Sequence, residues 1–202
     1  MTVLITGGTG TVGSRVIEEV LARGESVRTL SRRPETAKVP AGVEVTGSMQ
    51  TVDLARAAGV KAVVYLSVIH ADVFTEPPHL AAKAAVERMI QDFGIHASVL
   101  RPGVYMQNDL ALRDQLLREG VYRPAAGSRS VLCTDVRDLA EVAARELLRR
   151  VATPDASATT IDVVAPQVLS GDRVAAIWSS VLGREIGYGG DDLDRLEASF
   201  AQ

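Results

Sequence analysis

The chain has 202 residues, 47% of them hydrophobic and 23% charged, so it can bury a sizeable core and does not have the composition of a disordered protein. The 22 basic and 25 acidic residues give a net charge of −3, which provides no basic surplus for binding nucleic acid or an anionic membrane. One cysteine excludes an intrachain disulfide, and no apolar run is long enough for a membrane span. The three histidines lack metal-ligand spacing and the first residues lack a leader pattern, so we expect a cytoplasmic protein with no metal site.

The amino-terminal stretch predicts a strand, a glycine turn, a helix and a second strand. Residues 2–6 are a short β-branched apolar run, typical of a buried parallel strand, and residues 25–30 are predicted to form the second strand. Between them, apolar residues recur with helical spacing over 14–23, and Gly24 supplies a helix stop. Together these segments form a βαβ unit, for which a right-handed crossover is expected.

Strands and helices continue to alternate along the rest of the chain. Further strands are predicted at 43–46, 61–67, 97–100, 130–133 and 160–164. Helices are predicted at 52–58, 79–93, 108–119, 135–150, 170–182 and 192–200, and loops at 31–42, at 121–129 and after the break at 101–103. The alternation predicts a single α/β domain over 1–202 with a mostly parallel sheet, to which the part from about residue 103 adds a small α+β substrate lobe.

The turn after the first strand, GGTGTVG, matches the dinucleotide fingerprint G-x-G-x-x-G. One glycine takes backbone angles closed to other residues, another lets a pyrophosphate approach the main chain, and Gly13 lets the helix pack closely on the strand. Free N–H groups and the helix dipole then attract the anion. The motif lies between a predicted strand and a predicted helix, so we expect cofactor contacts, against the alternative of a purely structural turn, from Gly7, Thr9, Gly10, Thr11, Val12 and Gly13.

The residues after the second strand indicate which dinucleotide is bound. A carboxylate at this position would bind the ribose 2′-hydroxyl of NAD, but the sequence here is Ser31-Arg32-Arg33. A guanidinium suits a 2′-phosphate, because it forms forked charge-assisted hydrogen bonds. Ser31 and Arg32 are therefore expected to contact NADP, with NADPH preferred over NADH; the alternative is that the arginines are only surface charges.

Three longer segments carry a family resemblance: VLITGGTGTVGSRVIEEVLARGESVRTLSR, AAGVKAVVYLSVIHAD and HLAAKAAVERMIQDFGIHASVLRPGVYMQNDL. With these segments the chain resembles the NmrA-like group of atypical short-chain dehydrogenases/reductases. The resemblance covers most of the chain in the right order. It implies a doubly wound, mostly parallel Rossmann-like sheet that binds NAD(P).

One departure from the family pattern lies between the third and fourth strands. Such proteins normally have a helix, a further strand and another helix there, whereas Val45-Thr46-Gly47-Ser48 here leads almost at once into AAGVK. A helix and a strand are thus missing. Either the VVYLS strand is the neighbour of the first strand, or the sheet has a gap that a partner fills. The loop of the lost strand usually helps to hold the cofactor.

The resemblance also suggests which residues carry chemistry. Ser67 stands at the carboxyl end of its strand, where the family has its catalytic Ser, and His79-Leu80-Ala81-Ala82-Lys83 replaces Tyr-x-x-x-Lys. Lys83 is expected to bind the nicotinamide ribose. His79 lies one helical turn away and could donate a proton near neutral pH, or it could simply cap the helix.

The segment after the next strand suggests a substrate pocket. By resemblance, Pro102 passes the nicotinamide, while Tyr105, Met106 and Asn108 face the substrate. Tyr and Met would make an adaptable apolar pocket, but both are equally suited to a core. His70 is a further candidate for the pocket edge, with a solvated loop histidine as its alternative.

Two functions follow from these residues. The first is an NADPH-dependent reductase of a small carbonyl or quinone-like acceptor, which needs no active-site Tyr if the proton comes from water. The second is a non-catalytic NADP(H)-binding redox sensor that signals through a regulatory protein partner. A homodimer is a further expectation, and a shortened fold that binds no cofactor is a third alternative.

Overall fold

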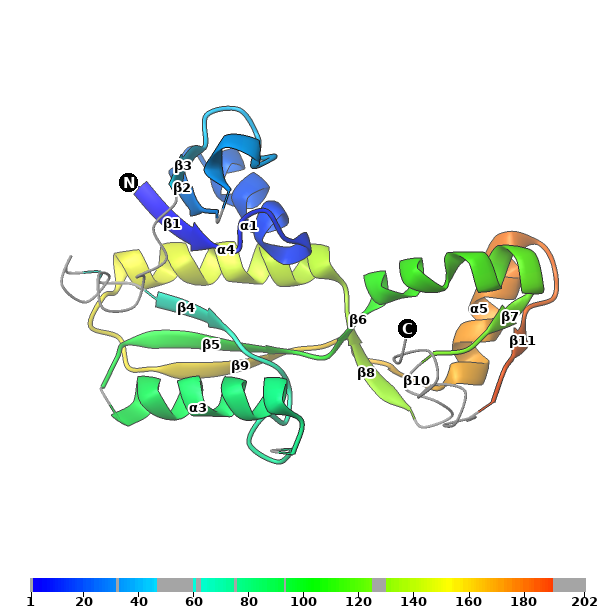
Figure 1. The fold of residues 1–202 in the computed structure, drawn as a ribbon. Helices are drawn as coiled ribbons and strands as arrows, with labels where there is room; N and C mark the ends of the chain where they lie inside the picture. The colour runs from blue at the N-terminus through cyan, green and yellow to red at the C-terminus, as the bar shows by residue number, and fades with distance from the viewer. Residues whose placement is uncertain are drawn as a thin grey trace. The chain divides into compact units, whose positions relative to one another are not determined.

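The structure is a computed structural model that describes residues 2–31, 33–46, 60, 63–74, 76–92, 94–124 and 130–190. These residues separate into two compact units, each with its own strands and helices (Figure 1). Unit 1 comprises Met1–Pro102 and Val136–Val163, and unit 2 comprises Gly103–Asp135 and Val164–Gln202. Unit 2 begins where the lobe was expected to begin, but residues 136–163 belong to unit 1.

The first sheet of unit 1 has three parallel strands in the order β1 (Thr2–Thr6), β2 (Ser26–Leu30) and β3 (Glu44–Thr46). Its buried side chains alternate with exposed ones, as the two-residue period of a strand requires. The buried face lies against α1 (Thr11–Ala22) and consists of Val3, Ile5, Val27 and Thr29. On the opposite face, Leu4 is exposed and Arg28 pairs with Glu44 at 2.8 Å.

The second sheet of unit 1 is also parallel, in the order β4 (Val63–Leu66), β5 (Ala97–Pro102) and β9 (Thr159–Val163). Helix α3 (Pro78–Asp92) covers one face and α4 (Val136–Ala152) the other (Figure 1). The central strand β5 is therefore covered on both sides, and all of its residues except Arg101 are buried. The expected break at Arg101-Pro102 is wrong: β5 runs on to Pro102, because a proline at the last position of a strand costs little.

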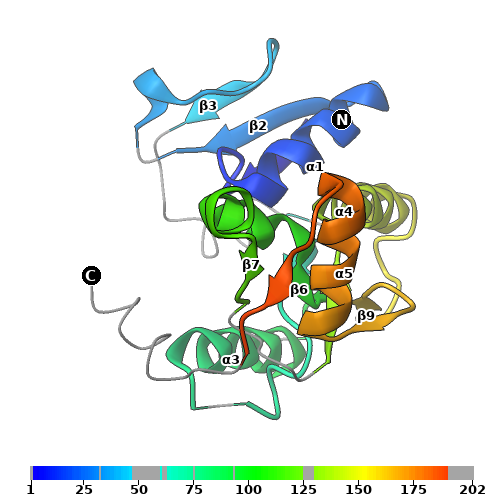
Figure 2. The same cartoon turned by 90° about the vertical axis from the view of Figure 1, so that its right-hand side faces the viewer.

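The two sheets of unit 1 do not join. In the described part of the chain, β1 pairs only with β2, and β4 pairs only with β5. The expectation that the VVYLS strand (β4) is the neighbour of the first strand (β1) is therefore wrong. Unit 1 is instead joined by packing of α1 against α4 (Figure 2). Three buried alanines in α4 allow close approach, and full burial of Ile17 and of Val20 in α1 each stabilises the unit by about 1.5–3 kcal/mol.

A fully buried arginine fastens α4 to the second sheet. The Arg150 guanidinium donates to Ser98 Oγ at 2.8 Å, to Thr159 Oγ1 at 3.0 Å and to the carbonyl of Ala97 at 2.7 Å. It also donates to the carbonyls of Ala156 and Ser157, which lie just before β9. Arg150 therefore joins helix and sheet through hydrogen bonds rather than apolar contact.

Unit 2 is a small α+β structure. Its strands β6 (Val104–Tyr105), β8 (Val131–Thr134) and β10 (Val168–Leu169) form one sheet in the order β10-β8-β6, and β7 (Val121–Tyr122) pairs with β11 (Gly187–Tyr188). Helix α5 (Gly171–Leu182) begins after Ser170 and stops at Gly183, as the sequence predicts. The core of unit 2 contains Leu116, Tyr122, Ala175 and Ile186, with Trp178 packed against them.

The middle of unit 2 departs from the expected regular helix at 108–119. A 3₁₀ segment covers Met106–Leu112 and a π-helical turn covers Gln115–Glu119, and strand β7 then stands where a loop was expected. The helix is irregular because Asp109 is tied on two sides, accepting from Tyr122 Oη at 3.0 Å and from Trp178 Nε1 at 3.1 Å. Both partners lie far along the chain, and helical spacing gives no information about them.

Elsewhere the predicted elements agree with the structure within a few residues. The helices expected at 52–58 and 192–200, and the start of the strand at 61–67, lie outside the described residues. Cys133 is buried and unpaired, as expected of a small apolar side chain. Among the helices of the described residues, none combines the length and apolar character needed to cross a membrane.

Candidate functional site

The glycine turn joins β1 to α1 through a compact backbone geometry. Gly7 has a left-handed φ of +71°, and the Gly10 N–H donates to the Gly7 carbonyl at 2.9 Å. Gly10 then stands as the N-cap of α1, without any side-chain hydrogen bond to the cap and without an acidic residue in the first helical turn. The first N–H groups of α1 thus meet no carboxylate of their own helix, which favours an external anion.

The glycines of the turn have different steric roles. A Cβ on Gly8 would lie 2.1 Å from Thr29 Oγ1, and one on Gly13 would lie 2.1 Å from the Gly7 carbonyl oxygen. Neither position can hold a side chain, because both approaches are far inside van der Waals contact. A Cβ on Gly10 would meet only the Gly7 carbonyl oxygen, at 3.3 Å, and Gly10 is exposed. The backbone surface at Gly10 is therefore open to a ligand.

The other residues expected to contact the cofactor at this turn are exposed or half-buried. Thr9 and Thr11 are exposed, and Val12 and Gly13 are half-buried at the start of α1. All six expected contact residues therefore lie on one short segment, which includes the helix N-terminus. A bare, side-chain-free turn at this point fits a diphosphate, whose oxygens accept hydrogen bonds from main-chain N–H groups.

At the end of β2, Ser31 is half-buried and its Oγ accepts a hydrogen bond from the Arg33 N–H at 3.1 Å. The backbone therefore turns sharply here, as an acceptor two residues back requires. The Arg33 residue is exposed. Arg32, the expected 2′-phosphate contact, lies outside the described residues, so its role stays a prediction.

Ser67 and Lys83 come together at the carboxyl end of β4. The Ser67 N–H donates to the Leu100 carbonyl at 2.8 Å, which extends the pairing of β4 with β5 by one residue. Its Oγ is buried and has no hydrogen-bond partner among the described residues. Since a buried hydroxyl is normally satisfied, the group is suited to bonding a ligand at this position.

Lys83 reaches the same strand end from α3. Its Nζ donates to the Leu66 carbonyl at 2.5 Å and lies 5.1 Å from the centre of the Tyr65 ring. Burial lowers the pKa of Lys83, because the ammonium loses hydration. One carbonyl and one aromatic face leave donor capacity on the ammonium, since it carries three N–H bonds.

His79 occupies the second position of α3, one turn before Lys83. The residue is exposed, and in the described part of the chain its ring has no hydrogen-bond partner. The first helical N–H groups, those of Leu80 and Ala81, donate to the Pro77 carbonyl at 2.9 and 3.0 Å. Pro77 thus fills the position that precedes the helix, while the His79 ring remains free for another role.

The loop after Ser67 is tied to β5 and carries His70. The Ile69 N–H donates to the Pro102 carbonyl at 2.9 Å, and Pro102 itself is buried at the end of β5. His70 is exposed and is the only described non-glycine residue with a positive φ, at 57°. The structure therefore brings Ser67, Lys83, His70 and Pro102 to the carboxyl ends of β4 and β5, the edge at which open α/β sheets bind ligands.

The remaining substrate candidates belong to unit 2. Tyr105 is half-buried, and burial raises the pKa of its phenol. Met106 and Asn108 are exposed, so Met106 is not part of a core. Between these residues, the Gln107 side chain donates to Asp135 Oδ1 at 2.9 Å, which connects the segment to the residue before α4.

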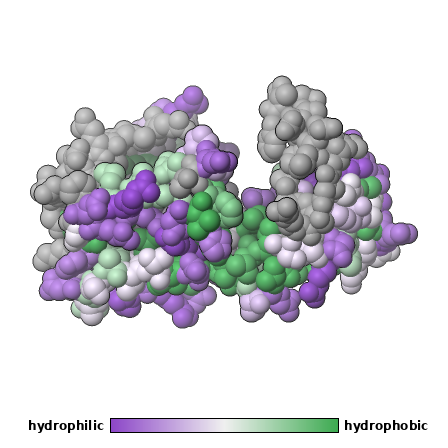
Figure 3. Space-filling view, turned by 90° about the horizontal axis from the view of Figure 1, so that it is seen from below, coloured by the Kyte–Doolittle hydropathy of each residue, from purple (hydrophilic) through white to green (hydrophobic). Residues whose placement is uncertain are grey.

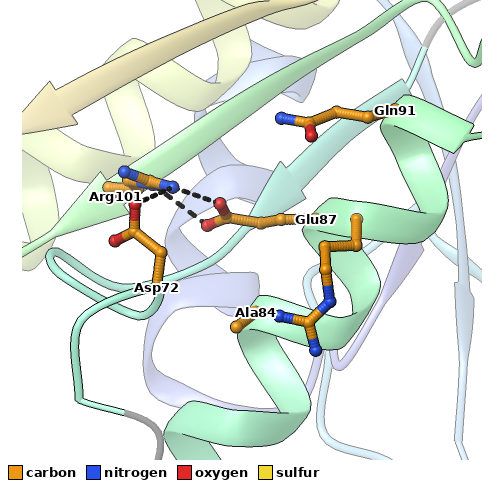
Figure 4. Close-up of a pocket in the computed structure, with 6 residues that line it drawn as sticks. Asp72, Ala84, Glu87, Gln91 and Arg101 are labelled. Atoms are coloured by element: carbon orange, nitrogen blue, oxygen red, sulfur yellow. Dashed lines mark hydrogen bonds and ion pairs between the residues drawn. The ribbon is translucent and has the colours of Figure 1, made fainter.

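A pocket of about 180 Å³ lies beside α3, lined by Asp72, Ala84, Glu87, Arg88, Gln91 and Arg101 (Figure 4). Arg101 donates through Nε to Glu87 Oε1 at 3.1 Å and forms a second bond through its terminal nitrogen. Asp72 lies 3.6 Å from the same guanidinium. These charges satisfy one another, so we assign the Arg101 cluster to joining β5, α3 and the loop after β4.

Two residues near the site carry no signal in the sequence. Tyr65 supports Lys83 with its ring, and burial raises the pKa of its phenol. Phe74 contacts His70 in an edge-on arrangement, with ring centres 6.3 Å apart. A tyrosine in a strand and an aromatic residue in a loop look like core and surface residues, and only the tertiary structure places them beside site residues.

Comparison with known proteins gives a consistent result. The model of the NmrA-like family matches residues 37–190. Quinone oxidoreductase 2 of Escherichia coli is 32% identical over 181 residues, which cover 71% of this chain and 63% of the relative. An NAD(P)H azoreductase of Xenophilus azovorans is 28% identical over 224 residues, which cover 92% of this chain and 76% of that protein. The chain thus spans less than two thirds of the first of these relatives.

Solved structures agree on the fold. A crystal structure described as a new type of NADPH-dependent quinone oxidoreductase from Escherichia coli has a TM-score of 0.82 and 25% identity, and covers all of this chain and 82% of that one. A Citrobacter triphenylmethane reductase has a TM-score of 0.81 and 23% identity over 100% of this chain and 82% of that chain.

The alignments also support the missing segment. The azoreductase alignment spans 224 residues, whereas 92% of this 202-residue chain is about 186 residues. About 38 aligned positions therefore have no counterpart here, the length of a helix with a strand. Such a deletion agrees with the unjoined sheets of unit 1.

Proposed function

Because the chain belongs to the NmrA-like family, we propose that it is an NADPH-dependent oxidoreductase that reduces a small carbonyl or quinone-like acceptor. The glycine turn carries this proposal: Gly8 and Gly13 exclude any side chain, and Gly10 leaves a bare surface at the start of α1. The named relatives, a quinone oxidoreductase and an azoreductase, support the class of acceptor.

The residues present fit NADP(H), which when bound supplies the hydride. The turn from Gly7 to Gly13 would bind the diphosphate, Ser31 and Arg32 the 2′-phosphate, and Lys83 the nicotinamide ribose. The unpartnered Ser67 hydroxyl would contact the same end of the cofactor, beside the backbone at Pro102. The Leu66 carbonyl and the Tyr65 ring position the Lys83 ammonium, which supports this role.

Of the steps of the reduction, proton transfer has the least support from the residues of this site. His79 occupies the place of the family tyrosine, is exposed, and stands one turn from Lys83. It can supply a proton near neutral pH, and a quinone-like acceptor can also take its proton from water. His70, Tyr105, Met106 and Asn108 stay the proposed substrate contacts.

A non-catalytic NADP(H) sensor is the second candidate. The replacement of the tyrosine by His79 favours it, as do the edges of β1 and β4, which are unpaired among the described residues and could bind a partner strand. A regulatory protein or a second copy in a homodimer would then read the cofactor state. For either function we propose a cytoplasmic location, and we propose that the lobe expected from about residue 103 onward binds the substrate.

The deciding experiment is a titration of NADPH and NADH into the purified chain, followed by NADPH oxidation with a panel of quinones. Tight NADPH binding with turnover supports the reductase, and binding without turnover on any acceptor supports the sensor. Absence of binding to either nucleotide would overturn both.

A further inference from the structure

The turn after β4 holds apolar side chains in water at a strained position. Val73 is 65% exposed and Phe74 is 56% exposed, although both follow a fully buried residue, Ala71. In the space-filling view, hydrophobic residues reach the surface among strongly polar ones (Figure 3). An exposed phenylalanine offers an apolar ring face to a ligand, and covering that face removes apolar surface from water.

The backbone of this turn is fixed rather than loose. His70 has a left-handed φ of 57°, and its carbonyl accepts from the Val73 N–H at 3.0 Å and from the Phe74 N–H at 3.1 Å. A left-handed non-glycine residue is strained and persists only where the surroundings hold it in place.

Three anchors hold the turn to β5. Ile69 is hydrogen-bonded to Pro102, Ala71 is buried, and Asp72 lies 3.6 Å from Arg101, which is itself fixed by Glu87 (Figure 4). The Val73 and Phe74 side chains remain exposed beyond these anchors. The left-handed backbone at His70 therefore accompanies an exposed Phe74 side chain.

The Phe74 ring has a defined orientation. The His70 and Phe74 rings stand edge to face at 80°, with centres 6.3 Å apart. Such a contact positions a ring while leaving a face free. Its turn begins three residues after Ser67, so the ring belongs to the loop that leaves the expected nicotinamide site.

We propose that the Phe74 ring, oriented by His70, is a stacking surface for a flat, multi-ring aromatic acceptor and determines the specificity for it. This proposal rests on the proposed reductase function and narrows its acceptor class. Offset stacking on Phe74 favours large planar acceptors over single-ring ones, because the stacked area grows with ring number.

The test compares wild type with Phe74→Ala, Phe74→Leu and the matched control Val73→Ala. With NADPH, Phe74→Ala should raise KM for 1,4-naphthoquinone about two- to tenfold, and that for 1,4-benzoquinone much less. Phe74→Leu should lose most of the same preference, whereas Val73→Ala should retain it. An equal KM change for both quinones would overturn the stacking role.

A binding measurement separates this proposal from the reductase function. Calorimetry with 2-methyl-1,4-naphthoquinone on the NADP⁺-loaded chain involves no turnover. Weaker binding in Phe74→Ala, with NADP⁺ affinity and melting temperature unchanged, supports the stacking surface whether or not the chain shows turnover. If no variant shows turnover, only the reductase function fails. Equal binding in both proteins, or none in either, overturns the surface.

The His70→Gly variant tests the ring orientation. Glycine accepts the left-handed backbone but removes the edge contact. We expect naphthoquinone affinity between those of wild type and Phe74→Ala. An affinity equal to wild type would remove His70 from the surface.

Discussion

At the level of single side chains, Lys83 and Gly13 show what the sequence can specify. Lys83 follows from its spacing to Ser67 and His79, but its contacts with the Leu66 carbonyl and the Tyr65 ring do not. Gly13 follows from the motif, and its steric reason, 2.1 Å to the Gly7 oxygen, appears only in the structure.

Lys83→Met should weaken NADPH binding about tenfold or more, because it removes a charge-assisted hydrogen bond. The matched control is Arg88→Ala, which removes an exposed cation from the same helix. Fluorescence titration measures both. An unaltered dissociation constant in Lys83→Met would remove the residue from the site.

The same residue predicts a pH dependence. The pKa of Lys83 is lowered in the folded chain, so the unfolded chain binds more protons between this pKa and the ordinary lysine value. Stability in wild type should therefore rise with pH across that window, relative to Lys83→Met. Chemical denaturation of both proteins at several alkaline pH values checks this, and parallel curves would contradict it.

Gly13→Ala should abolish the turn geometry, because its Cβ would overlap the Gly7 carbonyl. We expect destabilisation of about 1–3 kcal/mol together with loss of NADPH affinity. Ser14→Ala is the neighbouring control, since its hydroxyl donates only to Thr11 at 3.3 Å. Denaturant unfolding and NADPH titration measure the two effects, and wild-type behaviour of Gly13→Ala would be inconsistent with the packed turn.

Arg32→Asp should change cofactor selectivity. A carboxylate repels the 2′-phosphate and accepts a ribose hydroxyl, so the NADPH-to-NADH affinity ratio should fall about tenfold or more. Arg33→Asp serves as the adjacent comparison. If neither substitution changes the ratio, the arginines are surface charges.

At the level of helices and strands, burial patterns were predictable and long-range hydrogen bonds were not. The strand at Thr2–Thr6 and the helices over Gly171–Leu182 and Val136–Ala152 agree closely with their periodicities. The helix expected at 108–119 is broken because Asp109 bonds Tyr122 and Trp178. Neither partner is within reach of a local pattern.

The buried Arg150 makes a prediction about α4. Arg150→Met removes the guanidinium donors to the buried carbonyls of Ala97 and Ser157 and to Ser98 Oγ, and it should destabilise the chain by about 3 kcal/mol or more. Arg145→Met, an exposed residue paired with Glu141 on the same helix, should change stability by less than about 0.5 kcal/mol. Denaturant unfolding compares them, and equal losses would refute this role of Arg150.

At the level of the complete chain, the missing segment is the decisive feature. Unit 1 has two three-stranded sheets in place of one continuous sheet, and β1 and β4 each have an unpaired edge in the described residues. Packing of α1 on α4 replaces the lost strand pairing. The open edges are where a second copy or a regulatory partner would add a strand.

Hydrogen exchange tests the two-sheet arrangement. Amides of β1 should exchange faster than those of β2, and amides of β4 faster than those of β5, because the inner strands are paired on both sides. Measurement over a range of protein concentrations separates open edges from self-association. Protection of β1 equal to β2 at every concentration would mean that its edge is covered within one chain.

The amino-acid sequence alone determined the α/β alternation, the glycine turn, the family, and the location of Ser67 and Lys83 at strand and helix ends. These features follow from local periodicity, backbone sterics and fixed motif spacing. Only the tertiary structure decided that the sheets stay separate, that Arg150 joins α4 to β5 and β9, and that Phe74 stands outward on a strained turn. Those outcomes depend on contacts between residues distant in the chain, whose energies local patterns do not contain.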